Sequence, residues 1–291
     1  MTPPPAARDV LELLKPITWF PPMWALLCGV VSSGGAPLSR WSFLLAGIAL
    51  TGPLVCGTSQ AVNDWFDRHV DAINEPNRPI PSGRVGGRWG LCIAIVWTML
   101  SLVVAAITGK WVFIATVFGL ACAWAYSAPP FRFKTSGWIG PAVVALTYEG
   151  LSWFTGAAVM EGALPPARVL AVLALYSLGA HGIMTLNDFK AVEGDRATGL
   201  RSLPVVLGER PAALLASAVM ALPQAIVVVL LQVWGLTIPA AAVVLSLAAQ
   251  LCLMPRLVSA PARNAPWYNA TGVSLYVLGM MAAALGLGGY V

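Results

Sequence analysis

Nine long runs of apolar residues, separated by short polar segments, dominate the hydropathy pattern of the chain. Each run carries few or no charges and is long enough to cross about 30 Å of hydrocarbon as a helix. An isolated strand in lipid would leave its backbone unpaired, so every span is expected to be helical. The predicted spans are Ile17–Gly35, Trp41–Val62, Trp89–Gly109, Trp111–Pro130, Trp138–Met160, Val169–Leu186, Ala212–Gln232, Gly235–Met254 and Tyr268–Gly289.

Composition agrees with this pattern. Of the 291 residues, 58% are hydrophobic and 10% are charged, and the mean hydropathy of +0.77 is outside the range of soluble globular domains. We therefore predict one all-α membrane domain over residues 1–291, in contact with the lipid bilayer.

Basic residues indicate how the spans are oriented. With a cytoplasmic N-terminus, nine spans place all of the 17 Lys and Arg on the cytoplasmic side except Arg40, Lys110 and Arg168. The net charge of +5 is thus explained by topology and anion binding. Nucleic acid is not an expected partner, because no basic domain lies outside the membrane.

The segment after the second span carries three regularly spaced carboxylates. Asp64, Asp67 and Asp71 follow Asn63 and stand at i, i+3 and i+7, which predicts that all three lie on one helical face. A shorter copy follows the sixth span, where Asn187, Asp188 and Asp195 repeat the offsets of Asn63, Asp64 and Asp71; Ala191 stands where Asp67 would be. We call these segments the first and second acidic motifs and expect them to share one cation site.

The chemistry of the motifs favours Mg²⁺, with Mn²⁺ as an alternative, because hard oxygen ligands bind such ions together with substrate phosphates. A diphosphate is therefore the expected ligand, and nearby cations would neutralise it. The segment Pro76–Gly83 cannot form a continuous helix and is a candidate lid. The expected diphosphate-binding residues are Lys15, Arg68, Arg78, Tyr126, Ser127, Arg132, Lys134, Lys190, Arg196 and Arg201.

Ionisation of an allylic diphosphate needs a neutralised leaving group and a dry site for the cation. Trp65, Phe66 and Tyr126 are candidate aromatic walls for that cation.

Glu149 and His181 are the only ionisable residues expected at mid-span, and each has two interpretations. In one interpretation they form hydrogen bonds between helices; in the other they bind the acceptor. The five cysteines, all within predicted spans, are interpreted as small core residues.

The two loops resemble a known family. NDWFDRHVDAINEPNRPIPSGRV and NDFKAVEGDRATGLRSLPVVLG, with nine spans, are similar to the UbiA superfamily of intramembrane prenyltransferases, and more narrowly to its chlorophyll and bacteriochlorophyll synthase branch. The opening LLKPITWFPPMWALLCGVVSSG is most similar to the bacteriochlorophyll form. Beyond residue 210 the resemblance rests on span count alone.

The resemblance implies a helical bundle around a central cavity that holds a polyprenyl diphosphate, geranylgeranyl or phytyl. It implies catalytic roles for Asp67, Asp71, Asp188, Asp195, Arg68 and Lys190. The implied metal ligands are Asn63, Asp64, Asp67, Asp71, Asp188 and Asp195, and Asn63 and Asn187 are also expected to bind substrate. The implied acceptor is the propionate of bacteriochlorophyllide, in a bacterial intracytoplasmic photosynthetic membrane with the site facing the cytoplasm. Proteins of pigment biosynthesis are candidate partners.

Three alternatives stay open. In the first, the acceptor is chlorophyllide. In the second, the protein is an enzyme of the same fold whose acceptor is a quinone or haem precursor. The third alternative is a transporter or channel, which would place its charges near the midplane, whereas here they gather at one rim.

Overall fold

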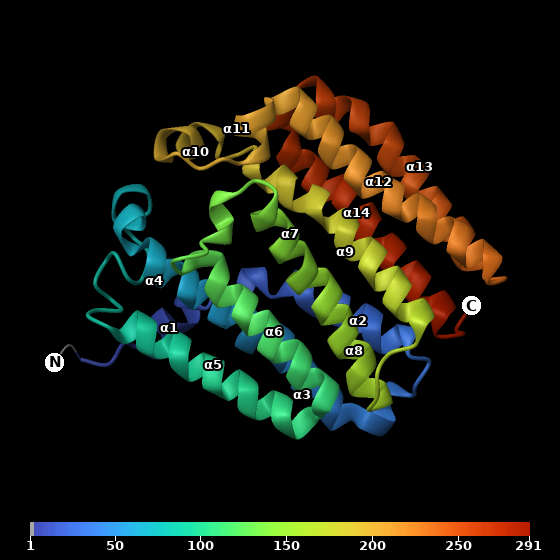
Figure 1. Cartoon of the computed structure of the whole chain (residues 1–291), viewed down its shortest axis with the longest axis horizontal. Coiled ribbons are helices and arrows are strands. Elements are labelled where there is room, and N and C mark those ends of the chain that lie inside the picture. Colours follow the sequence, from blue (N-terminus) through green and yellow to red (C-terminus); the bar gives the residue numbers. More distant parts are fainter. Residues whose placement is uncertain (1–2) are drawn as a thin grey trace.

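The computed structural model describes residues 3–291, which form a bundle of helices without strands in that range (Figure 1). The all-α prediction is therefore confirmed. The helices are α1 (Ala7–Leu13), α2 (Phe20–Ser32), α3 (Trp41–Ala49), α4 (Gly57–Asn74), α5 (Trp89–Thr108), α6 (Lys110–Ser127), α7 (Ile139–Ala145), α8 (Ser152–Glu161), α9 (Ala167–Asp188), α10 (Val192–Thr198), α11 (Leu203–Leu207), α12 (Glu209–Val233), α13 (Thr237–Ser259) and α14 (Pro261–Leu287). Short 3₁₀ turns occur at η1 (Pro16–Thr18), η2 (Pro37–Arg40) and η4 (Phe133–Thr135), and π-helical turns at η3 (Leu50–Cys56) and η5 (Leu146–Leu151).

Eight helices within residues 3–291 are each long and apolar enough to span a membrane. The remaining predicted span, Ile17–Gly35, corresponds to a pair of segments, Ala7–Thr18 and Phe20–Ser32, bent by 58° at their junction. Pro21 and Pro22 lie in the first turn of α2, where missing N–H groups cost no helical hydrogen bond. The chain is thus a multi-pass membrane protein with eight candidate spans among the described residues, or nine if the bent pair forms one span.

Two spans contain π-helical turns. The second runs through α3, η3 and α4 from the 3₁₀ turn at Pro37 to Asn74, and Pro53 within η3 lacks the N–H that a regular helix would use. The fifth is formed by α7, η5 and α8. Because a π turn takes one extra residue, it changes which side chains face a neighbouring helix.

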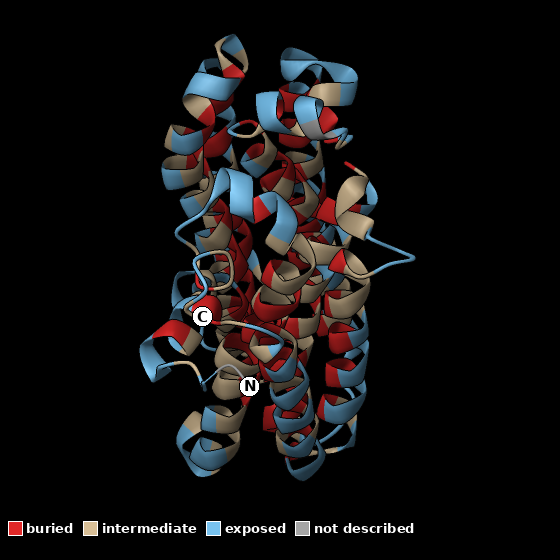
Figure 2. Ribbon diagram, turned by 90° about the vertical axis from the view of Figure 1, so that its left-hand side faces the viewer, coloured by how far each residue is buried: buried red, intermediate tan, exposed pale blue. Residues whose placement is uncertain are grey.

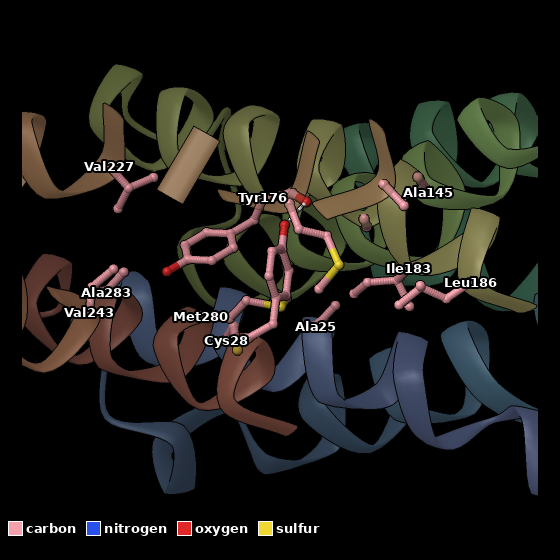
Figure 3. Packing of buried hydrophobic residues seen from close by; sticks show 14 of the residues in the cluster. Ala25, Cys28, Ala145, Tyr176, Ile183, Leu186, Val227, Val243, Met280 and Ala283 are labelled. Carbon is pink, nitrogen blue, oxygen red and sulfur yellow. Dashed lines mark hydrogen bonds between the residues drawn. The ribbon is translucent and has the colours of Figure 1, made fainter. Parts of the chain in front are cut away.

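The largest core lies between α2, α9, α12, α13 and α14. Figure 3 shows Cys28, Tyr176 and Met280, from three of these helices, within this cluster, and the hydroxyl of Tyr276 donates to the Tyr176 carbonyl at 2.6 Å. Elsewhere α2 and α8 approach so closely that a Cβ at Gly156 would collide with the Leu26 carbonyl. Small residues thus bring the helices together by van der Waals packing, as is typical inside membranes.

The outer faces of the helices are apolar and exposed, whereas buried residues lie along the inside (Figure 2). Ile107 is 74% exposed, Val233 74% and Leu245 71%. Contiguous exposed apolar surface of this extent is unfavourable in water and is the surface that lipid chains cover.

Both acidic motifs and the N-terminal helix lie toward one end of the bundle, and the C-terminus lies at the other (Figure 1).

Candidate functional site

A cavity of about 680 Å³ lies among α4, α6, the α7–η5–α8 span and α9. Its deep walls are mostly small or apolar, with Leu50, Val55, Gly119 and Leu151 among them. Its rim carries charged and amide side chains from both motifs and from the α6–α7 connection, namely Asn63, Asp67, Asp71, Arg132, Lys134, Asn187, Asp188 and Asp195. The site therefore joins a polar head region to an apolar chamber.

The first acidic motif lies on α4, which continues beyond the predicted span to Asn74, as expected from its spacing. Asn63 donates an amide hydrogen bond to Asp67 at 2.9 Å and another to the buried Ser127 hydroxyl at 3.1 Å. Lys134 forms an ion pair with Asp67, and Arg78 pairs with Asp71 at 2.9 Å. Asp67 and Asp71 thus face the cavity with their charges compensated by basic side chains.

Asp64 is the exception to the one-face prediction. It is fully buried and does not line the cavity; it pairs with Lys15 at 2.6 Å, and Arg78 lies 3.6 Å away. At 3.6 residues per turn, Asp64 lies about 60° around α4 from Asp67, which is enough to direct it to a different neighbour. The predictions that Asp64 binds metal and that Lys15 binds the diphosphate are not supported by these positions.

The second acidic motif does not lie on one helix. Asn187 and Asp188 end α9, and Asp195 is in the separate helix α10, yet all three line the cavity. The offsets shared with the first motif therefore arise across a helix break. Residues of both motifs thus line one cavity, although by a different local structure, and the shared cation site stays a prediction.

The α6–α7 connection brings basic residues to the rim. Gly137 donates its backbone N–H to the Arg201 carbonyl at 2.8 Å, which ties this connection to the one after α10. A Cβ at Gly137 would lie 2.5 Å from that carbonyl oxygen, so only glycine fits. Burial lowers the pKa of Lys134 below its ordinary value, although the Asp67 carboxylate opposes the shift.

Several expected site residues do not line the cavity in the part of the chain that the structure describes. Arg68 lies over the Trp65 ring at 4.3 Å and donates to the Trp65 carbonyl, and Phe66 packs edge-on against Trp124. Of the three candidate aromatic walls, only Tyr126 is in place. Outside the lining are Lys15, Asp64, Arg68, Arg78, Ser127, Glu149, His181, Lys190, Arg196 and Arg201.

The two mid-span ionisable residues also lie outside the cavity. His181 is on α9 with Asp188, as the spacing predicted, but its Nε2 contacts the Trp138 carbonyl at 3.1 Å. Glu149 is buried in η5, and its Oε2 has no hydrogen-bond partner among the described residues. The interpretation as a hydrogen bond between helices fits His181. The positions of His181 and Glu149 do not support an acceptor-binding role for either residue.

Sequence reasoning missed a polar group within the apolar chamber. Gln60 and Tyr148 line the cavity and are hydrogen-bonded to each other at 3.2 Å. Cys56, interpreted from the sequence as a core residue, also lines it, 3.3 Å from the Tyr148 hydroxyl. Gln60 lies seven residues before Asp67, so helical spacing from the motif is a signal that would have found it.

The residues of the rim suit a divalent cation by their chemistry. Every acidic or amide side chain that lines it offers oxygen ligands, the type that Mg²⁺ prefers. Among the described residues, however, no three acidic, histidine or cysteine side chains are grouped closely enough to form a complete metal site. Mg²⁺ commonly takes only one or two ligands from protein carboxylates and the rest from substrate phosphates and water.

The sequence and the fold both identify the family. Residues 22–278 match the model of the UbiA prenyltransferase family, and the chain belongs to that family. This excludes the transporter or channel alternative.

Two relatives differ in their similarity to this chain. The chain is 59% identical over 285 residues to the bacteriochlorophyll synthase 33 kDa chain of Cereibacter sphaeroides, covering 98% of this chain and 94% of that protein. Chloroplastic chlorophyll synthase of Oryza sativa subsp. japonica is 40% identical and covers 68% of this chain and 54% of that protein.

A solved structure shares the fold. A UbiA homologue from Archaeoglobus fulgidus, bound to DMAPP and Mg²⁺, superposes with a TM-score of 0.68 at 21% identity, covering 95% of this chain and 99% of that one.

Proposed function

We propose that this protein transfers a polyprenyl group from its diphosphate to the propionate carboxylate of bacteriochlorophyllide. The single observation that carries the proposal is the cavity, in which a rim of carboxylates and cations stands over an apolar chamber. Such a site fits a ligand with a diphosphate head and a hydrocarbon tail. The acceptor is proposed from the 59% identity to the bacteriochlorophyll synthase chain of Cereibacter sphaeroides.

The donor would bind with its head at the rim. Asn63, Asp67, Asp71, Asp188 and Asp195 are the residues proposed to hold Mg²⁺ or Mn²⁺, which when bound would neutralise charge on the diphosphate. Arg132 and Lys134 supply further positive charge at the same rim. The geranylgeranyl or phytyl chain would extend between the small side chains below.

A carboxylate acceptor suits the deep part of the cavity. Among the described lining residues, the four carboxylates all lie at the rim and none is a histidine. A carboxylate is ionised at neutral pH and needs no general base, whereas attack by an aromatic ring carbon requires loss of a ring proton. The positions of Glu149 and His181 outside the cavity therefore favour the carboxylate acceptor.

The reaction balances without an added acid or base. One oxygen of the acceptor carboxylate forms a bond to C1 of the allylic group, and the bond from C1 to the diphosphate oxygen breaks. The electron pair leaves with the diphosphate, whose charge the rim stabilises. The apolar walls exclude water, which would otherwise compete as the nucleophile.

The test uses purified protein with Mg²⁺ and geranylgeranyl diphosphate, offered bacteriochlorophyllide, chlorophyllide or 4-hydroxybenzoate. We expect an esterified bacteriochlorophyllide as the main product. Preferred esterification of chlorophyllide would support the chlorophyll synthase alternative. Prenylation of 4-hydroxybenzoate without pigment esterification would reject the proposal in favour of a quinone-type enzyme.

We also propose that the cavity rim faces the cytoplasm of a bacterial photosynthetic membrane, where proteins of pigment biosynthesis would deliver the acceptor. The positions of the basic residues support this orientation. Single cysteines at Gly86 and Val291 in a cysteine-free variant should be labelled from opposite sides of the membrane. Labelling of both from one side would contradict the nine-span topology.

A further inference from the structure

The polar group in the apolar chamber consists of Cys56, Gln60 and Tyr148, contributed by two facing spans. Gln60 Nε2 donates a hydrogen bond to the Tyr148 hydroxyl at 3.2 Å, and Cys56 Sγ lies 3.3 Å from the same oxygen. Gln60 is seven residues before Asp67, which places it on the same face of α4 and about 10 Å deeper. The group is therefore below the rim, about two helical turns deeper than Asp67.

The geometry orients the phenolic proton of Tyr148. Because the Gln60 amide donates to the phenolic oxygen, the hydroxyl proton of Tyr148 must point elsewhere. Cys56 Sγ lies 3.3 Å from the hydroxyl; either atom can donate in this contact, and as an acceptor the sulfur is weak. An ionised carboxylate in the chamber would be a much stronger acceptor for that proton.

The local backbone supports a functional interpretation independently. Cys56 is the last residue of η3, and Tyr148 lies within η5, so each comes from a π-helical turn of its own span. Single π turns within α-helices are rare and frequently occur at functional sites. Two such π turns, η3 and η5 in different spans, bring the Cys56 and Tyr148 side chains into contact.

We propose that Tyr148, oriented by Gln60, binds the acceptor by donating a hydrogen bond to one oxygen of its carboxylate, while the other oxygen attacks C1. Tyr148 keeps its proton throughout, so the hydroxyl selects and positions the nucleophile. This inference rests on the proposed carboxylate acceptor.

The test compares binding of bacteriochlorophyllide with that of its methyl ester, which lacks the carboxylate charge, to wild-type protein and to Tyr148→Phe. Wild-type protein should bind the free acid about ten- to a hundredfold more tightly than the ester, as expected for a hydrogen bond to a charged group. Tyr148→Phe should lose most of that preference and raise the acceptor KM, while the KM for geranylgeranyl diphosphate stays unchanged. Gln60→Met should show the same change more weakly.

Tyr290→Phe is the matched control, because the Tyr290 hydroxyl bonds to the Gly35 carbonyl at 3.0 Å and lies outside the cavity. An unchanged preference for the free acid in folded Tyr148→Phe would overturn the inference. Wild-type activity of Tyr148→Phe together with inactivity of Tyr148→Leu would also overturn it, since the ring would then be what matters. Absence of pigment esterification by the wild-type protein would instead reject the proposed function itself.

Discussion

The first acidic motif lies on one unbroken helix with its carboxylates paired to basic side chains, whereas the second is divided between α9 and α10. Asp64, Asp67 and Asp71 are held by Lys15, Lys134 and Arg78. Asp188, in contrast, forms no ion pair with any residue that the structure describes. A cation entering the rim can therefore meet Asp188 without displacing a side chain, while at the first motif it competes with lysine and arginine.

The two motifs have similar spacing but differ in how the charges of their carboxylates are compensated. In the first, charge compensation within the protein stabilises the fold of the rim. In the second, Asp188 is partly buried and has no ion pair among the described residues, although the Lys190 charge acts on it; burial of such a carboxylate is unfavourable by itself and favours binding of a cation. Removing the cation and removing individual carboxylates should therefore have separable effects on activity and on stability.

The largest expected effect is that of metal removal. Excess EDTA should abolish prenyl transfer, and added Mg²⁺ should restore it, because the diphosphate charge would otherwise stay uncompensated. The amount of prenylated product formed by the purified protein, with and without EDTA, measures this dependence on Mg²⁺. Full turnover in EDTA would contradict a metal-dependent mechanism.

Asp64→Asn should mainly reduce stability, by about 3 kcal/mol, because it leaves the partly buried Lys15 without its partner. The midpoint of thermal unfolding in detergent measures the change. Replacing both partners with apolar residues, as in Lys15→Met with Asp64→Leu, should recover most of the loss. If Asp64→Asn kept its stability but lost activity, Asp64 would be a metal ligand as the spacing first indicated.

Asp188→Asn should reduce kcat/KM by about 10²- to 10³-fold without lowering the unfolding midpoint, since it removes an uncompensated charge. Asp67→Asn should lose similar activity and also unfold at a lower temperature, because Lys134 loses its partner. Glu193→Gln, an exposed acidic residue of α10 outside the cavity lining, is the control. Equal unfolding midpoints for Asp67→Asn and Asp188→Asn would remove the proposed difference between the motifs.

The smallest expected effect concerns Arg84, which pairs with Asp9 at 2.7 Å and Glu12 at 2.6 Å and ties α1 to the connection after the first motif. Since the pair with Glu12 is largely exposed, Arg84→Gln should lower the unfolding midpoint only slightly, and less in high salt. Unfolding midpoints at two salt concentrations would show this, with the exposed Arg88→Gln as the control. A larger loss that does not depend on salt would contradict a surface ion pair.

The sequence by itself determined the membrane class, the long helices and the two motifs. Hydrophobic length and charge placement are local properties, and lipid leaves an apolar segment of that length little choice but a helix. The continuation of α4 through Asp71 was likewise predictable, because the periodic carboxylates lie on an uninterrupted helical pattern.

Only the tertiary structure decided which side chains face the cavity. Asp64, Glu149 and His181 carry the expected chemistry but lie outside the cavity lining, whereas Gln60 and Tyr148 form a polar pair within the chamber. The physical reason is that the direction of a side chain depends on helix packing and on the extra residue of each π turn, which sequence spacing does not reveal. The break after Asp188 and the Gly137–Arg201 contact then bring the second motif to the first, through interactions between segments far apart in the chain.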